Sequence, residues 1–355
     1  MKGLLLAGGH GTRLRPLTYT GNKHMLPVAN KPLIQYGLEH LRAAGIKEIG
    51  IILGPIKEGV TEFLKDGSPF GVKITYIEQK EPKGLAHAVL VARPFLGEDP
   101  FVMYLGDNLL KQGINPIVRE FKKQQYDATI LLSRVKNPQR FGVAVLKEGK
   151  VVRLIEKPPD PPSDLALVGI YIFKPSIHES IEKLKPSKRG ELEITDAIQG
   201  LVDRGLTVNP HIVQDWWKDT GRPEDLLEAN QLVLTDLQPK LEGKLDPEAS
   251  IQGNVQVGKE TVIKNKSRIR GPVTIGTNCV IGPNVYIGPY TSIGDHVQIQ
   301  NCEIEYSIIM DDTTINCHER IVNSLIGKHV SINSSKETLP KGKQLILGDR
   351  SEITL

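Results

Sequence analysis

The first segment that could carry chemistry is a glycine-rich turn that directly follows a short apolar run at the amino terminus. Gly8, Gly9 and Gly11 would let backbone N–H groups converge on an anion without obstruction by Cβ atoms. Arg13 and Lys23 follow, and together they could offer positive charge to a polyphosphate. Position 14 lacks the glycine of a dinucleotide fingerprint, and the P-loop sequence Gly-Lys-Ser/Thr is absent. We therefore predict a phosphate-binding turn here, with an ordinary tight turn as the alternative.

Acidic residues follow two other apolar runs. Asp107 comes after the expected strand Phe101–Leu105, and Glu156 with Lys157 comes after the expected strand Val151–Ile155. Open α/β sheets bind ligands at the carboxyl ends of their strands, so both places are candidate ligand-binding positions. The alternatives are a simple turn at Asp107 and a solvated Glu-Lys pair.

The elements that must position these residues alternate between strands and helices up to about residue 240. The strand candidates are mostly continuous in apolar character, which suits a sheet covered on both faces. They are Leu4–Ala7, Ile49–Leu53, Val72–Ile77, Phe101–Leu105 and Ala128–Ser133. This alternation predicts an α/β fold with a mostly parallel, Rossmann-like sheet.

The first expected helix shows the clearest signals for its ends. Asn30 is expected to cap it, Pro32 fits its first turn, and Gly45 can close it. Ile34, Leu38 and Leu41 would share one buried face. Residues 85–92, 115–124 and 222–234 are further helix candidates.

After about residue 245 the apolar pattern acquires a period of six. The recurring residues are Ile251, Val257, Ile263, Ile269, Ile275, Ile281, Ile287, Ile293 and Ile299. Such a period is typical of a hexapeptide parallel β-helix, of the left-handed kind, in which stacked coils bury an aliphatic column. The register slips near Glu305 and resumes less cleanly at Ile309, Ile315 and Ile321.

This change of period predicts two domains. We expect a catalytic domain over residues 1–240 and a β-helix domain over residues 241–355, with the linker inside Pro239–Pro247. The three cysteines, Cys279, Cys302 and Cys317, show no CxxC spacing and are expected to be small buried apolar residues.

Charge and hydropathy exclude several functional classes. The 45 basic and 41 acidic residues are well mixed and leave a formal charge of +4, too weak a bias to indicate nucleic-acid or membrane binding. No apolar run approaches the ~20 residues needed to cross a bilayer. We expect a cytoplasmic protein.

An ordered series of motifs identifies a resemblance. The motifs are residues 8–16, 23–32, 79–88, 104–108, 141–143, 156–158, 168–171, 189–196 and 217–221. In this order they resemble the sugar nucleotidyltransferase family, and within it the long form of the glucose-1-phosphate thymidylyltransferases, which has an extra C-terminal domain. The resemblance covers roughly residues 1–235.

The resemblance implies roles for individual residues. The implied nucleotide-binding residues are Leu6, Gly8, Gly9, Gly11, Thr12, Arg13, Gln79, Gly84 and Asp107. The implied sugar-phosphate-binding residues are Gly142, Glu156, Lys157, Val168, Gly169 and Trp217, although a core role for Val168 and Trp217 remains an alternative. The implied catalytic residues are Arg13, Lys23, Asp107, Lys157 and Asp219, with Asp107 and Asp219 as ligands of a Mg²⁺ cofactor.

The implied reaction joins dTTP to glucose 1-phosphate and releases dTDP-glucose and pyrophosphate, for deoxysugar (such as rhamnose) or polysaccharide biosynthesis. It needs no protein nucleophile, because a sugar phosphate with a second pKa near ~6 can itself attack the α-phosphorus. The protein must then position two anions and stabilise their charge. His10, His24 and His87 lie near the motifs and are interpreted as loop or packing residues.

Three other interpretations remain open. UTP could replace dTTP, since the two bases differ by one methyl group. The β-helix could add acetyltransferase activity, with His296, His318 or His329 as a base, although the regular hexads show no long loop to cover coenzyme A. A silent nucleotide-sugar-binding regulator is less compatible with the presence of Arg13, Lys23, Asp107 and Asp219. The flat faces of the β-helix favour a homo-oligomer.

Overall fold

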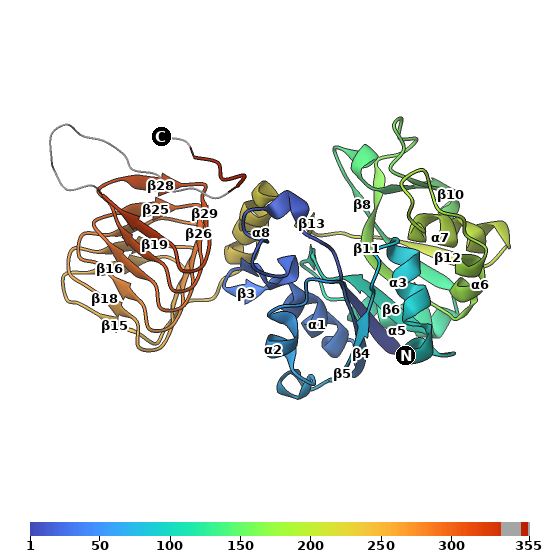
Figure 1. Cartoon of the computed structure of the whole chain (residues 1–355), viewed down its shortest axis with the longest axis horizontal. Helices are drawn as coiled ribbons and strands as arrows, with labels where there is room; N and C mark the ends of the chain where they lie inside the picture. The colour runs from blue at the N-terminus through green and yellow to red at the C-terminus, as the bar shows by residue number, and fades with distance from the viewer. Residues whose placement is uncertain (335–348, 354–355) are drawn as a thin grey trace. The chain divides into compact units, whose positions relative to one another are not determined.

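The computed structural model describes residues 1–334 and 349–353 and divides into two compact units (Figure 1). Unit 1 comprises Met1–Gly11, Thr20–Met25 and Leu33–Asp219; unit 2 comprises Thr12–Tyr19, Leu26–Pro32 and Thr220–Leu355. Two short pieces of the amino-terminal region therefore group with the part of the chain that begins at Thr220. The domain boundary at residue 240 stays a prediction.

Unit 1 is built on a nine-stranded mixed sheet with the main order β10-β9-β11-β6-β1-β4-β5, and with β8 and β12 attached beside β11. The strands are β1 (Lys2–Ala7), β4 (Glu48–Leu53), β5 (Lys73–Glu78), β6 (Phe101–Leu105), β8 (Ala128–Arg134), β9 (Gly142–Lys147), β10 (Lys150–Glu156), β11 (Leu165–Phe173) and β12 (Val208–Ile212). Strands β6, β1, β4 and β5 run parallel to one another. Strand β11 is antiparallel to β6, β8 and β9, and β9 is antiparallel to β10. The predicted α/β fold is confirmed, with an antiparallel part that the apolar runs do not reveal.

Helices cover both faces of this sheet (Figure 1). Helices α1 (Leu33–Ala43), α2 (Val60–Leu64) and α5 (Asn115–Gln124) cover one face; α3 (Leu85–Val91), α6 (Ser176–Glu182) and α7 (Ile194–Asp203) cover the other. Short helix α4 (Arg93–Leu96) follows α3. Alternate residues of β1 enter the two cores: Leu4 belongs to one and Leu5 to the other. Burial on both faces explains why this strand is apolar throughout, since each large side chain contributes roughly 1.5–3 kcal/mol.

The start of α1 corrects one prediction. Asn30 does not cap this helix; it lies at the tip of a hairpin formed by β2 (Pro27–Val28) and β3 (Lys31–Pro32), with φ 60°. Its side-chain Nδ2 donates a hydrogen bond to the carbonyl of Ile293 at 2.6 Å. Tertiary hydrogen bonding therefore replaces the local cap. The buried face and Gly45 at the helix end are confirmed.

Unit 2 contains helix α8 (Pro223–Thr235) and a parallel β-helix of three stacked sheets, drawn in yellow to red in Figure 1. The first sheet is β14 (Lys240–Leu241), β17 (Val255–Val257), β20 (Val273–Ile275), β23 (Thr291–Ile293), β26 (Ile308–Ile309) and β29 (Leu325–Ile326). The second is β15 (Lys244–Leu245), β18 (Val262–Ile263), β21 (Val280–Ile281), β24 (Gln298–Gln300), β27 (Thr314–Asn316) and β30 (Ser331–Asn333). The third is β16 (Ser250–Gln252), β19 (Arg268–Arg270), β22 (Tyr286–Ile287), β25 (Glu303–Glu305) and β28 (Arg320–Val322).

The period of six is explained by these three sheets. Successive members of the aliphatic series lie on successive sheets, and residues 18 apart stack, as Ile251, Ile269 and Ile287 do. The predicted left-handed parallel β-helix is thereby confirmed. The slip in register arises because Ile299 is followed by Ile304 after five residues, which shortens that coil. The three cysteines are buried and free, as predicted.

The segment expected to be a linker is already part of the β-helix. Strands β14 and β15 lie inside it and pair with β17 and β18. The prediction of a linker over Pro239–Pro247 was therefore wrong, because these residues form the first coil. None of the helices in the described part of the chain is both long enough and apolar enough to cross a membrane.

Candidate active site

The carboxyl ends of β1 and β4 approach each other closely through two glycines. A Cβ atom on Gly54, just after β4, would lie 2.3 Å from the Gly8 carbonyl oxygen. A Cβ atom on Gly8 would lie 3.3 Å from the Gly54 nitrogen. Only glycine fits at position 54, so the backbone turn after β1 lies directly against the next strand end.

Asp107 and Lys23 form a buried ion pair just beyond β6. The ammonium of Lys23, in the 3₁₀ turn η2 (Lys23–Met25), contacts Asp107 Oδ2, and the two side chains are 14% and 12% exposed. Burial opposes ionisation of Asp107, but the charge of Lys23 and its hydrogen bond hold the pKa of this carboxyl well below the ordinary value. A Cβ atom on Gly9 would lie 3.0 Å from Lys23 Cε, so the glycine turn makes room for this cation.

His24 fixes the turn that carries Lys23. Burial and the neighbouring Lys23 charge lower the His24 pKa to about 3, against a smaller opposing effect of Asp107, so the ring is neutral at neutral pH. Its Nδ1–H and its backbone N–H both donate to Asn22 Oδ1, at 2.7 and 2.9 Å. Asn22 in turn donates to the Ala7 carbonyl at 2.9 Å, at the end of β1. The Lys23 turn is therefore hydrogen-bonded to the sheet.

Asp219 enters the same region through a short antiparallel ladder. Strand β13 (Trp217–Asp219) pairs with β7 (Asn108–Leu110), which places Asp219 opposite Asn108, the residue after Asp107. Asn108 Nδ2 donates to Asp107 Oδ1 at 3.0 Å, and the Trp217 indole N–H donates to Asn108 Oδ1 at 2.7 Å. Asn108 thus connects residues implied in metal and sugar binding. The motif of residues 104–108 contained it, but its role depends on a pairing that the sequence does not show.

Asp107, directly before β7, and Asp219, at the end of β13, are the two carboxylates implied as metal ligands. No group of three or more His, Cys, Asp or Glu side chains able to hold a metal occurs in the described ranges 1–334 and 349–353. Mg²⁺ usually takes one or two protein carboxylates and completes its shell with phosphate and water oxygens. Asp107 and Asp219 therefore fit Mg²⁺ that is shared with a substrate.

Gly142 and Glu156 lie opposite each other at the ends of β9 and β10. Thr195 Oγ1 donates to Glu156 Oε2 at 2.6 Å, and Arg189 Nη1 lies 3.3 Å from Glu156 Oε1. A Cβ atom on Gly142 would lie 2.7 Å from Thr195 Oγ1, so glycine is required beside this bond. Thr195 and Arg189 belong to a quoted motif, but the sequence assigned them no role.

Lys157 has a strained backbone next to this carboxylate. Its φ is 41°, in the left-handed region, and its N–H donates to the Phe141 carbonyl at 3.0 Å. Such a conformation costs of order 1–3 kcal/mol for a non-glycine residue and concentrates at functional sites. Its Nζ lies 3.5 Å from Glu156 Oε1.

The remaining implied residues are placed as follows. Val168 is fully buried in the core, the role left open as an alternative, and Gly169 has φ 80° beside Leu105. The Leu6 carbonyl accepts the Gly106 N–H at 2.9 Å. Gln79 and Gly84 are hydrogen-bonded to each other at 3.2 Å beyond the end of β5.

Two implied residues belong to unit 2. Thr12 and Arg13 are exposed and lie in the 3₁₀ turn η1 (Thr12–Leu14). A Cβ atom on Gly221 would lie 3.1 Å from Arg13 Nη2, so the glycine of the last motif leaves room for the guanidinium. Unit 1 thus brings together Lys23, Asp107 and Asp219, while Arg13 is positioned by unit 2.

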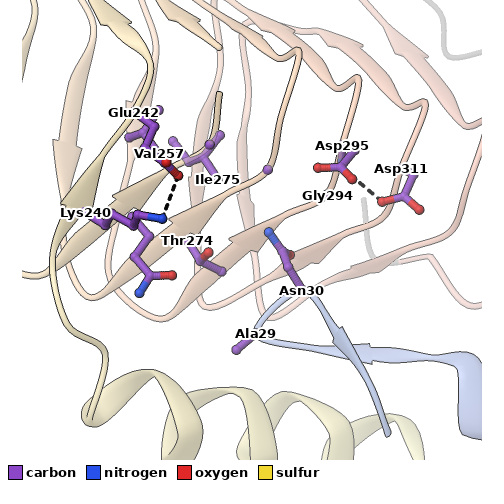
Figure 2. A pocket seen from close by; sticks show the side chains of 13 residues that line it. Ala29, Asn30, Lys240, Glu242, Val257, Thr274, Ile275, Gly294, Asp295 and Asp311 are labelled. Carbon is purple, nitrogen blue, oxygen red and sulfur yellow. Dashed lines mark hydrogen bonds and ion pairs between the residues drawn. The ribbon is translucent and has the colours of Figure 1, made fainter. Parts of the chain in front are cut away.

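A separate cavity of about 260 Å³ lies in unit 2, between the β2–β3 hairpin tip and the first sheet of the β-helix (Figure 2). Its charged side chains are paired: Lys240 with Glu242 at 2.9 Å, and Asp311 with Lys328 at 2.8 Å. Asp295 Oδ1 accepts the Thr277 N–H at 2.6 Å. These local pairings explain the polar lining without a ligand. Of the motif residues, only Ala29 and Asn30 line this cavity.

Comparison with known proteins decides the family. The family model described as nucleotidyl transferase matches residues 2–236. The chain belongs to the nucleotidyl transferase family. A second model, described as the GMPPB C-terminal domain, matches residues 269–353.

Relatives of this nucleotidyl transferase match it over its full length. It is 49% identical to the low-salt glycan biosynthesis nucleotidyltransferase Agl11 of Haloferax volcanii, with all of both chains covered. It is 47% identical to a glucose-1-phosphate thymidylyltransferase of Streptomyces griseus, with 100% of this chain and 99% of the relative covered. The predicted resemblance is confirmed.

A solved structure supports the same assignment for part of the chain. It is a putative glucose-1-phosphate thymidylyltransferase from Bacillus anthracis in complex with a sucrose, 40% identical, with a TM-score of 0.63. The match covers 68% of this chain and 98% of that chain. The catalytic fold is therefore shared with a solved member of the family.

Proposed function

We propose that this nucleotidyl transferase joins dTTP and glucose 1-phosphate to give dTDP-glucose and pyrophosphate. The observation that carries the proposal is the buried Lys23–Asp107 pair at the carboxyl end of β6, with Asp219 on the adjoining ladder. The full-length relative in Streptomyces griseus is named for this activity. The product would serve deoxysugar, such as rhamnose, or polysaccharide biosynthesis.

The residues of unit 1 suit transfer without a protein nucleophile. Attack by the sugar-phosphate oxygen on the α-phosphorus requires two repelling anions to be held in line. Lys23 supplies a fixed cation beside the glycine turn, where backbone N–H groups can approach the triphosphate. Mg²⁺, held by Asp107 and Asp219, would neutralise phosphate charge when bound. We propose that Arg13 adds a further cation.

At the other substrate, Glu156 and Lys157 have complementary tasks. Thr195 and Arg189 hold the Glu156 carboxylate, which can accept hydrogen bonds from sugar hydroxyls. Lys157 Nζ lies beside that carboxylate and can bind the sugar phosphate. Gly142, Gly169 and Trp217 are proposed to border the sugar, with Val168 behind them in the core.

The proposal extends to the setting of the enzyme. Because nucleoside triphosphates are intracellular metabolites, the proposed reaction implies action in the cytoplasm. The flat sheets of the β-helix favour association with a second copy. We expect size-exclusion chromatography with light scattering to give a homo-oligomer mass.

One assay tests the proposed reaction and its nearest alternatives. Purified protein is mixed with each nucleoside triphosphate and with several hexose 1-phosphates, with and without Mg²⁺, and pyrophosphate release is measured. The highest kcat/KM is expected for dTTP with glucose 1-phosphate, and chelation of Mg²⁺ should abolish release. A preference for UTP would change the assigned nucleotide, and acetyl-CoA turnover with an amino-sugar phosphate would support a second activity. Absence of pyrophosphate release with all pairs would reject the proposal.

A further inference from the structure

The amide of Gln79 is held in one orientation at the carboxyl end of β5. The Gln79 side chain is buried, with 6% of the residue exposed, and its Nε2 donates to the Gly84 carbonyl at 3.2 Å. A carbonyl oxygen can only accept a hydrogen bond, so the NH₂ side of the amide must face Gly84. Glycine is required at position 84, because its φ is 101° and an added Cβ would lie 2.5 Å from the Leu192 carbonyl oxygen.

His87 completes this orientation from the first turns of α3. Its Nδ1 lies 3.0 Å from Gln79 Nε2 and accepts the second amide hydrogen. This requires a neutral ring with the proton on Nε2. Burial and the charge of Lys83 lower the His87 pKa, while Glu81 opposes them, which favours the neutral ring.

The orientation leaves the amide oxygen for a ligand. In the part of the chain that the structure describes, no residue donates a hydrogen bond to Gln79 Oε1. This oxygen points toward Gly8 in the glycine turn after β1, where an added Cβ would lie 3.4 Å from it. Gly8 has no side chain to cover the oxygen, so a planar group could reach it here.

We propose that His87 is a positioning residue for nucleobase selection. It fixes which end of the Gln79 amide, the oxygen or the NH₂ group, meets the base. The inference rests on the proposed function. The fixed Oε1 accepts a hydrogen bond from a ring N–H, which thymine and uracil carry at N3. Cytosine has a lone pair at N3, which Gln79 Oε1 repels. An unrestrained amide could rotate and offer its NH₂ to cytosine. The Gly84 carbonyl and His87 Nδ1 together oppose this rotation, and His87 supplies the shorter of the two contacts and the one that a substitution can remove.

The test replaces His87 and measures nucleotide binding. His87→Phe keeps the ring but removes the acceptor, while His87→Asn places Oδ1 where Nδ1 stood. His318→Phe, at an exposed position of the β-helix, is the matched control. Dissociation constants for dTTP and dCTP are measured by calorimetry with Mg²⁺ and without sugar phosphate, and thermal melting confirms that each variant folds.

The expected result is a loss of selectivity in one variant alone. The wild type should bind dTTP about 10²-fold more tightly than dCTP. With dCTP, the buried Gln79 Oε1 would face the lone pair at cytosine N3, which costs binding free energy. His87→Phe should lower this ratio about tenfold or more. His87→Asn and His318→Phe should keep it within about threefold of the wild type.

Three outcomes would overturn the proposal: equal wild-type binding of the two nucleotides, an unchanged ratio in His87→Phe, or an equal loss in His87→Asn. If His87→Phe does not fold, His87→Leu, which also lacks the acceptor, takes its place. Its selectivity for dTTP over dCTP is then compared with that of His87→Asn. Selective wild-type binding of dTTP without pyrophosphate release from any sugar phosphate would instead reject the proposed reaction, and the assignment of His87 would stand.

Discussion

The two ends of strand β6 place a buried ionisable residue in opposite surroundings. Beyond its carboxyl end, Asp107 contacts Lys23 and accepts a hydrogen bond from Asn108. At its amino end, His178 of α6 stacks on Phe101 with ring centroids 6.0 Å apart. Neither His178 ring nitrogen has a hydrogen-bond partner among the described residues.

The two ends of the sheet therefore bury different kinds of side chain, partnered charged groups at one end and aromatic rings at the other. At the carboxyl end, charged groups are buried in partnered positions, at a desolvation cost that apolar packing does not require. At the amino end, aromatic packing dominates, and the Lys2–Asp99 ion pair there is partly solvated, with Asp99 47% exposed. We expect changes at the carboxyl end to affect turnover and changes at the amino end to affect the free energy of unfolding.

The largest expected effect is the loss of turnover in Asp107→Asn. The change removes a proposed Mg²⁺ ligand and leaves the buried Lys23 ammonium without its counter-charge. We expect kcat/KM for pyrophosphate release to fall about 10⁴-fold. Asp99→Asn, at the amino end, is the matched control and should change kcat/KM by less than about twofold. Wild-type turnover of folded Asp107→Asn would remove the distinction between the two ends.

Next in size is the loss of stability in Phe101→Ala. Phe101 is fully buried and packs on Phe173 at a centroid distance of 5.6 Å as well as on His178. We expect urea unfolding to show a loss of about 3–4 kcal/mol, since the cavity cannot close completely. Both KM values should stay within about twofold of the wild type, because no implied substrate contact lies at this end. A large change in KM for either substrate would contradict the contrast, and Phe101→Leu should lose less stability.

A smaller effect is expected for a substitution at the carboxyl end of the sheet that tests whether Thr195 positions Glu156. Thr195→Val keeps the side-chain shape but removes the 2.6 Å hydrogen bond to Glu156. Because bonds to charged groups contribute about 1.5–3 kcal/mol, KM for glucose 1-phosphate should rise ~10-fold or more. The KM for dTTP should not change, and Thr195→Ser should restore the wild-type value. Equal rises in both KM values would indicate a general disturbance and not the positioning of Glu156.

The carboxyl end also shows how far the sequence could predict the fold. Apolar runs identified β1, β4, β5 and β6 to within two residues. Strands β1, β4 and β6 are buried on both faces and are therefore almost continuously apolar. The antiparallel part was missed at β11, whose apolar run Leu165–Phe173 is interrupted by Gly169. Strand direction and pairing depend on tertiary contacts that a local pattern does not contain.

The candidate site shows the same limit at the level of side chains. The resemblance supplied Asp107, Asp219 and Glu156, which carry the implied chemistry. It did not supply Asn108 or Thr195, whose importance appears only when hydrogen bonds across the sheet are known. Residues that orient other residues have no spacing rule of their own, and His87 was interpreted as a packing residue for that reason.

The smallest expected effect lies at the amino end, in the pH dependence of stability. Burial and the charge of Arg93 lower the His178 pKa, against smaller opposing effects of Glu98 and Glu182. The unfolded chain, with a histidine pKa near ~6.5, therefore takes up a proton before the folded chain does. The free energy of unfolding therefore has its full value above that pH. It decreases as the pH falls, by up to about 1.4 kcal/mol per pH unit.

His178→Leu removes both the titrating ring and its unpartnered nitrogens. Compared with the wild type, the variant should gain about 1 kcal/mol at pH 7.5, because a buried group without a hydrogen-bond partner is lost. The advantage should grow at pH 5, since leucine takes up no proton in the unfolded chain. Urea unfolding at the two pH values measures both effects, with His318→Leu as the exposed control. A variant less stable than the wild type at pH 5 would mean that the His178 ring is a partnered group, and the amino end would then resemble the carboxyl end.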